Sequence, residues 1–255
     1  MSIPYSRYII GELPWYGMLI VAGVLAAMAL CIHEEKRLHM KEDTMIDLAF
    51  WAIPLALVGA RAYYAIFNWQ VFAADPWSVL RIWEGGIAIY GAIIGGLIGV
   101  LCFSMRHGIP AFQLTDIIAP GLALAQGIGR WGNYFNMEAY GREITNPALQ
   151  FFPIGVQIPG PNGYTWHMAT FFYESCWDVI VFVLLWFVIR KRSVKNGTVT
   201  LWYLLLYGSG RFMIEGLRTD SLMSGSIRVS QLLSLLLAVF AGIMLIIQCN
   251  RRKKD

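Results

Sequence analysis

Seven long apolar stretches constrain this chain more than any other feature of its sequence. A helix that crosses a bilayer needs roughly 20 mostly apolar residues. Stretches of this kind cover residues 15–32, 46–67, 87–105, 113–134, 170–189, 199–214 and 229–247. With 57% hydrophobic and 14% charged residues, the 255-residue chain has more apolar surface than one soluble core could bury. The sequence therefore predicts an all-α integral membrane protein with seven transmembrane helices.

The basic residues predict how these helices are oriented, because lysine and arginine favour the cytoplasmic side of a membrane. They follow alternate stretches, as Lys36, Arg37 and Lys41, then Arg106, then Arg190, Lys191, Arg192 and Lys195, and finally residues 251–254. We expect the N-terminus outside and the C-terminus in the cytoplasm. The first stretch has no basic leader and no cleavage pattern, which indicates a retained span. The net charge of +4 lies mostly in these loops and suits anionic lipid better than nucleic acid.

No polar segment between the stretches is long enough to bury a core of its own. We therefore expect a single polytopic membrane domain over residues 1–255, with an external irregular loop or small cap at about residues 135–169. Strong turn signals, among them the run Pro159-Gly160-Pro161-Asn162-Gly163, support this interpretation.

Glycines recur every four residues in the third stretch, at Gly91, Gly95 and Gly99. This spacing leaves one helix face bare, so that a neighbouring backbone can approach closely. We interpret it as a packing surface rather than a lipid-binding one.

The sequence places Arg61, Arg130 and Arg211 inside, or at the outer ends of, apolar stretches. Each would cost about 2.5–3.5 kcal/mol at the centre of a bilayer, so each needs a carboxylate, a carbonyl, water or an anionic ligand. For Arg61, carbonyl bonding in a packing role is the favoured alternative.

A helix face that includes Tyr207, Arg211, Glu215 and Arg218 carries two guanidinium groups and one carboxylate. It predicts either a surplus positive charge that attracts an anion or a buried ion network that only holds helices together.

The run GIGRWGNYFNMEAYGRE, residues 127–143, combines a second arginine with polar side chains and glycines. Guanidinium groups form paired hydrogen bonds with phosphate and keep their charge at physiological pH. The run therefore indicates an anionic headgroup. The small residues Gly129, Gly132 and Gly141 would allow close approach of such a ligand, or simply close helix packing.

These residues also carry a resemblance. GRWGNYFNMEAYG, residues 129–141, closely resembles the signature of the bacterial prolipoprotein diacylglyceryl transferases. Further similar segments follow the same order along almost the whole chain, including WYG at 15–17, WEGG at 83–86, TFFYE at 170–174 and YGSGRFMIEGLR at 207–218.

The resemblance implies an enzyme of the bacterial cytoplasmic (inner) membrane whose active site faces outward. It would transfer the diacylglyceryl group of phosphatidylglycerol to the lipobox cysteine thiol of a prolipoprotein, releasing glycerol phosphate in the first step of lipoprotein maturation. The prolipoprotein would bind through its signal sequence and would supply the nucleophile itself. We expect no cofactor, no metal and no nucleic-acid partner.

For this reaction we assign the lipid phosphate to Arg130 and the charge on the leaving phosphate to Arg211. Glu138 and Glu215 would orient the arginines or accept the thiol proton. Further candidates for contacts with phosphate or glycerol hydroxyls are Tyr16, Tyr90, Asn133, Asn136, Gly141, Arg218 and Arg61.

The chain departs from the family pattern at two positions. Tyr90 stands where many members have a histidine, so a histidine base cannot be transferred to this chain. Met168 and Ala169 replace a His-Pro pair, and we assign no role to the neighbouring His167. Two other classes remain open, a transporter or flippase for an anionic lipid and a purely structural membrane subunit.

Overall fold

All seven predicted stretches form helices in the computed structural model, which describes residues 6–160, 163–192, 195–219, 223–224 and 227–252. The chain divides into two compact units, residues 31–117 and the remainder. The seven helices are α1 (Trp15–Arg37), α2 (Thr44–Phe67), α4 (Ile89–His107), α5 (Ala111–Asn136), α6 (Thr170–Val183), α8 (Thr198–Glu215) and α9 (Val229–Arg252).

Within the described ranges, five helical segments are long and apolar enough to cross a membrane. They are Trp15–Arg37, Thr44–Phe67, Ile89–His107, Thr170–Arg192 and Val229–Asn250. Helices α5 and α8 are long enough, but polar side chains such as Gln126, Arg130 and Arg211 lower their mean hydropathy. The fold is therefore that of a helical membrane protein, and the two helices outside this group are those that carry Arg130 and Arg211.

In the unit of residues 31–117, α2 packs closely against α4, and glycine makes this possible. A Cβ atom at Gly99 would lie 2.7 Å from the Cα atom of Ala52, and one at Gly59 would lie 3.0 Å from the Cα atom of Gly95. The packing interpretation of the glycine spacing is thus confirmed. Short helices connect α2 to α4, namely α3 (Trp69–Phe72), η1 (Pro76–Leu80) and η2 (Ile82–Glu84).

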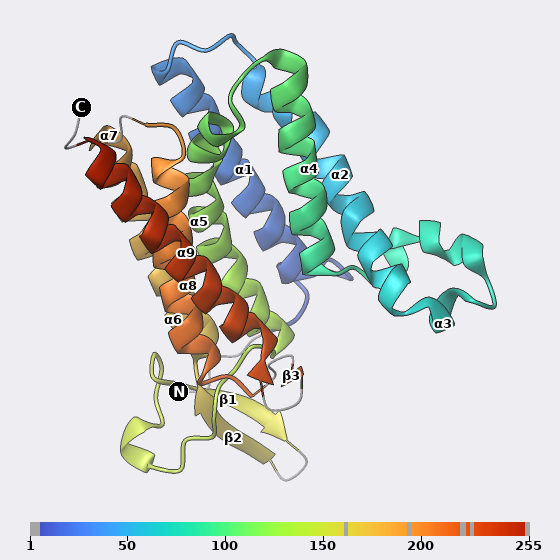
Figure 1. Cartoon of the computed structure of the whole chain (residues 1–255). Helices are drawn as coiled ribbons and strands as arrows, with labels where there is room; N and C mark the ends of the chain where they lie inside the picture. Colours follow the sequence, from blue (N-terminus) through green and yellow to red (C-terminus); the bar gives the residue numbers. More distant parts are fainter. Residues whose placement is uncertain (1–5, 161–162, 193–194, 220–222, 225–226, 253–255) are drawn as a thin grey trace. The chain divides into compact units, whose positions relative to one another are not determined.

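In the other unit, α5, α6, α8 and α9 run side by side (Figure 1). Helix α6 continues through a π-helical segment, η4 (Leu184–Ile189), into α7 (Arg190–Arg192). Its buried residues pack with those of α5 and α8 into one apolar cluster: Ala119, Ala123, Val181, Leu185, Val199 and Tyr203.

The predicted cap is more regular than expected, because it contains an antiparallel hairpin of β1 (Gly155–Gly160) and β2 (Gly163–Met168). Gly160 pairs with Gly163 at its tip, and Pro161 and Asn162 lie outside the described residues. The hairpin lies at the end of the helices where α5 ends and α6 begins (Figure 1). The cap is anchored there by Tyr134, Val156, Ala169 and Phe171.

A second hairpin, β3 (Met223–Ser224) and β4 (Ile227–Arg228), precedes α9. The prediction of an all-α fold was therefore incomplete, since proline and glycine signal turns without specifying the strands on either side. Of the terminal basic residues used for the orientation, Lys253 and Lys254 lie outside the described part of the chain.

Replacing Gly95 by alanine should destabilise the pair of α2 and α4. The new Cβ atom would lie 2.8 Å from the Leu55 carbonyl carbon, whereas a Cβ atom at the adjacent Gly96 meets Ala56 at an ordinary 3.7 Å. We expect Gly95→Ala to cost about 1–3 kcal/mol through overpacking and Gly96→Ala to be neutral. Thermal unfolding in detergent checks this, and equal melting temperatures for the two variants would refute it.

Candidate active site

A glutamate that the sequence assignment did not include, Glu174 on α6, lies between Arg130 and Arg211. Its Oε2 atom is 2.7 Å from Nε of Arg130 on α5, and its Oε1 atom accepts a hydrogen bond from Nη1 of Arg211 on α8. The Glu174 side chain is only 3% exposed. One buried carboxylate therefore holds guanidinium groups from two other helices.

The cluster extends along α8 to Glu215 and Arg218. Nη2 of Arg211 lies 2.6 Å from Oε2 of Glu215, one helical turn away, and Nη1 of Arg218 lies 3.8 Å from Oε2 of Glu174. The predicted contact between Arg211 and Glu215 is confirmed. The side chains of Arg130 and Arg211 nevertheless remain 19% and 15% exposed, so their carboxylate partners do not seal them off.

Close packing of α5 against α6 brings Glu174 to Arg130. The Ser175 hydroxyl donates a hydrogen bond to the Gly127 carbonyl at 2.8 Å and accepts one from Nε1 of Trp131 at 3.1 Å. A Cβ atom at Gly127 would lie 3.3 Å from the Ser175 carbonyl oxygen. Glycine at this position lets α6 approach, and Arg130 lies one turn along the same face of α5.

The other side of α6 packs on α8 through Trp177, whose Nε1 donates to the Leu206 carbonyl at 2.9 Å. The indole ring also covers Gly210, where no side chain would fit. Because Arg211 follows Gly210 directly, this contact holds α6 and α8 together beside the cluster.

All three helices contribute to the cluster near their cap-side ends. Glu174 is four residues from the start of α6, Arg211 four residues from the end of α8, and Arg130 six residues from the end of α5. At 1.5 Å per residue these depths are roughly 6–9 Å. The charges thus lie one to two turns below the cap.

Tyr16 on α1 lies beside this region. A Cβ atom at Gly132 would be 2.5 Å from Cδ2 of the Tyr16 ring, so the ring rests directly on the bare α5 backbone. Both Arg130 and Glu138 interact electrostatically with the phenol, which is 37% exposed. The structure therefore brings Tyr16 close to two other predicted site residues.

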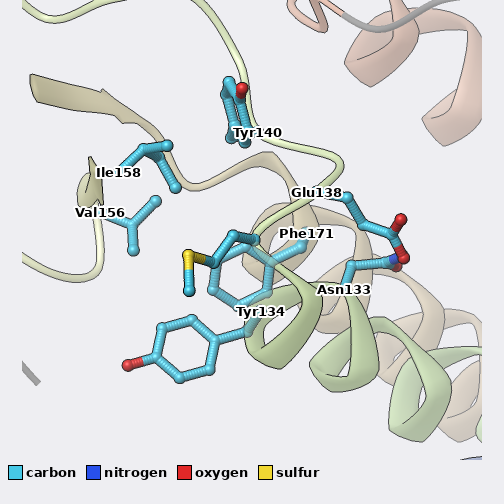
Figure 2. A pocket seen from close by; sticks show the side chains of 8 residues that line it. Asn133, Tyr134, Glu138, Tyr140, Val156, Ile158 and Phe171 are labelled. Carbon is cyan, nitrogen blue, oxygen red and sulfur yellow. The ribbon is translucent and has the colours of Figure 1, made fainter. Parts of the chain in front are cut away.

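Glu138 has partners other than the predicted arginines. Its Oε1 atom accepts hydrogen bonds from Nδ2 of Asn133 at 2.9 Å and from Nδ2 of Asn136 at 3.3 Å. Figure 2 shows Glu138 and Asn133 at one side of a pocket whose other side is apolar. The pocket is lined by Asn133, Tyr134, Met137, Glu138, Tyr140, Val156, Ile158 and Phe171.

Gly141 occupies a tight crossing point of the cap. Its N–H donates to the Met168 carbonyl at 2.8 Å, and a Cβ atom there would lie 2.8 Å from Cγ2 of Thr170 and 3.0 Å from the Leu217 carbonyl oxygen. These contacts favour the packing alternative over direct contact with a ligand.

Arg61 and Tyr90 belong to the unit of residues 31–117. The five N–H groups of Arg61 donate to the carbonyls of Ser78, Val79, Arg81, Gly85 and Gly86, at 2.5–3.2 Å. No N–H group of Arg61 remains to bind a phosphate. The favoured alternative, carbonyl bonding in a packing role, is therefore the observed one. The assignment of Arg61 as a substrate-binding residue is corrected. Tyr90 lies in the first turn of α4, with its ring centroid 6.3 Å from that of Tyr63.

Two carboxyl residues and one tyrosine contact were missing from the sequence assignment. Glu174 and Asp178 both lie on α6, and the Tyr207 hydroxyl is hydrogen-bonded to Arg130. The sequence did contain a signal for the two acidic residues. Two carboxyl groups four residues apart are costly in an otherwise apolar span, which indicates that they have partners inside the protein.

The arrangement can bind an anion, because its arginines are held in place, partly exposed and surrounded by apolar helices. Guanidinium groups in such a setting orient phosphate oxygens and stabilise charge that develops on them. Fold and site together define a helical membrane protein with a polar, arginine-rich cluster inside its helical bundle.

Comparison with known proteins places this chain within a family. Residues 7–247 match the family model for prolipoprotein diacylglyceryl transferase. The chain belongs to this family.

Three similar proteins are named phosphatidylglycerol–prolipoprotein diacylglyceryl transferase. The protein from Limosilactobacillus reuteri (strain DSM 20016) is 46% identical over 240 residues, 93% of this chain and 87% of the relative. That from Listeria welshimeri is 43% identical over 234 residues, 89% and 82% of the two chains. That from Streptococcus agalactiae serotype V is 43% identical over 240 residues, 94% and 92%.

Substituting glutamine for Glu174 should lower the stability of the protein, because two guanidinium groups lose their shared charge. Breaking a buried ion pair costs about 3–5 kcal/mol, and the partial exposure of both arginines places the expected loss at the lower end. The exposed Glu143 on the cap serves as a control, since Glu143→Gln should change stability by less than about 0.5 kcal/mol. Matching melting temperatures for both variants would contradict the role of Glu174.

Proposed function

We propose that this chain transfers the diacylglyceryl group of phosphatidylglycerol to the cysteine thiol of a prolipoprotein. The observation that carries the proposal is the pair of partly exposed arginines held by Glu174, in a chain that belongs to a family of such transferases. A phosphodiester headgroup supplies the anion that this cluster suits.

The reaction needs few groups from the enzyme. A sulfur–carbon bond forms at the glycerol carbon of the diacylglyceryl group, the bond from that carbon to the phosphate oxygen breaks, and the thiol proton passes to a carboxylate, for which Glu138 and Glu215 are the candidates. The products are a thioether and glycerol phosphate. Because the substrate supplies the nucleophile, the enzyme has to position the phosphate, stabilise its growing charge and exclude water.

Arg130 and Arg211 perform the first two tasks in this proposal. Arg130 binds the phosphate of the lipid, and Arg211 stabilises the second negative charge as the bond to the glycerol carbon breaks. Glu174 is a positioning residue that aims both groups, and Glu215 supports Arg211 from its own helix. Arg218 adds positive charge at the same end of α8.

Polar groups near Glu138 would contact the remainder of the headgroup. Asn133 and Asn136 donate hydrogen bonds to the Glu138 carboxylate, and the Tyr16 phenol interacts electrostatically with both Glu138 and Arg130. Amide, carboxylate and phenol groups all form hydrogen bonds with hydroxyls, so these side chains suit the free glycerol of phosphatidylglycerol. The Tyr90 hydroxyl is a further candidate for a hydrogen bond to the phosphate.

We also propose that all seven long helices span the bacterial inner membrane as one polytopic domain, with the cluster toward the outer face. The basic residues at the C-terminal ends of α1, α4 and α9, and those that form α7, support an external N-terminus and a cytoplasmic C-terminus. In the unit that contains the cluster, the cap and the charged residues share one end of the helices, opposite the α7 segment.

Purified protein incubated with phosphatidylglycerol, labelled separately in the acyl chains and in the headgroup glycerol, and with a lipobox peptide tests the activity. Acyl-chain label should appear on the peptide, and headgroup label should appear in glycerol phosphate. A peptide with serine in place of cysteine should remain unlabelled. Movement of intact phosphatidylglycerol between leaflets without labelled peptide would instead indicate a flippase.

Arg130→Lys should abolish most of this transfer while the protein still inserts into membranes. Lysine keeps the charge but loses the planar set of donors that binds Glu174 and phosphate together. We expect a fall in kcat/KM of about 100-fold or more, comparable to removal of an oxyanion-binding donor. Arg106→Lys, on the exposed last turn of α4, is the matched control and should retain full activity. An active Arg130→Lys enzyme would remove Arg130 from the proposed site.

A further inference from the structure

Asp178 is a buried carboxyl group to which the mechanism above gives no task. It lies one turn after Glu174 on α6, and the residue is 2% exposed. Among the described residues, its Oδ2 atom has no hydrogen-bond donor. Oε2 of Glu174 and Oε2 of Glu215 also lack a hydrogen-bond donor, but each lies within 2.7 Å of a guanidinium nitrogen. No such ion pair to Asp178 occurs among the described residues, and burying an ionised carboxylate is costly unless its oxygens are satisfied.

Two sets of groups surround Asp178: the charged residues of the arginine cluster, and two tyrosines of α8 that lie farther from the cap. Arg130 on α5 and Arg211 on α8 interact with it electrostatically, as does Glu174 on its own helix. Tyr207 and Tyr203 on α8 also interact electrostatically with Asp178, and their rings stack with centroids 5.4 Å apart. The Tyr203 hydroxyl donates a hydrogen bond to Oε1 of Gln126 on α5 at 3.0 Å, which links α8 to α5 at this level.

The charge of Asp178 therefore determines how strongly the cluster attracts an anion. Arg130, Arg211 and Arg218 contribute three positive charges. Ionised Glu174, Glu215 and Asp178 contribute three negative ones. Protonation of Asp178 adds one net positive charge beside the two arginines that face the ligand. A phosphodiester brings one negative charge, which this added charge would balance.

We propose that Asp178 takes up a proton when a phosphodiester lipid enters the arginine cluster and releases it when the site empties. This inference rests on the proposed function, because it takes the ligand of the cluster to be a lipid phosphate. Asp178 is a positioning residue in this role, since it acts on the ligand through Arg130 and Arg211. The proton comes from solvent through the partly exposed arginine end of the cluster.

The sign of the effect follows from linkage. The bound state holds one more proton than the free state, so a lower pH favours binding, and lipid affinity rises as the pH falls. For one proton the rise cannot exceed about tenfold per pH unit. An unprotonatable residue of the same shape at position 178 would remove the dependence and leave the tight-binding charge state in place.

The test measures the affinity of the full-length protein for short-chain phosphatidylglycerol in detergent, without peptide, between about pH 5 and pH 8. In the wild-type protein the affinity should rise as the pH falls. Asp178→Asn should bind at least as tightly as wild type at the upper pH and show no slope. Asp178→Glu, which keeps a titratable carboxyl group, should restore the slope, and His167→Asn should leave it unchanged.

Several outcomes overturn the inference. They are a flat wild-type profile, a wild-type slope in Asp178→Asn, weaker binding by Asp178→Asn at every pH, or loss of the slope in His167→Asn. If Asp178→Asn does not fold, the wild-type profile and Asp178→Glu still decide. An Arg130→Gln arm separates the two proposals, because unchanged lipid binding in that variant refutes the phosphate site itself. Lost binding in Arg130→Gln, with a wild-type slope in Asp178→Asn, refutes only the role of Asp178.

Discussion

The buried carboxylate of Glu174, shared by Arg130 and Arg211, is the interaction on which the rest of the site depends. Guanidinium groups are costly among apolar helices, and a carboxylate from a third helix meets that cost while fixing the direction of both. Their partial exposure keeps the outward side of each group available for a ligand. The same contact therefore supports the fold and, in the proposed reaction, aims the two groups that bind the phosphate.

Small residues bring the helices close enough for this contact. Gly127 lets α6 approach α5, Gly210 lies beneath Trp177, and Gly132 provides the surface on which the Tyr16 ring rests. In the other unit, Gly95 performs a similar task between α2 and α4. Because lipid offers little hydrophobic drive for helix association, close backbone packing and hydrogen bonds between helices position the polar groups.

Sequence patterns predicted the helices and the local pairs, and the structure supplied the contacts between helices. Seven apolar stretches gave seven helices, and the spacing of Arg211 and Glu215 predicted their contact, because both features depend on neighbours along one helix. The position of Glu174 between two arginines depends on how three helices pack. Spacing along a single sequence does not predict such contacts between helices. The carbonyl-bonded state of Arg61 likewise required the loop to be placed around it.

The central claim is that the two arginines aimed by Glu174 hold the phosphate of a membrane lipid. An experimental structure of the protein in a lipid nanodisc with phosphatidylglycerol bound tests it most directly. The account predicts phosphate oxygens within about 3 Å of guanidinium nitrogens of both Arg130 and Arg211, with Glu174 still in contact with each. A lipid phosphate bound elsewhere, with both arginines closed over Glu174 and Glu215 alone, would contradict it.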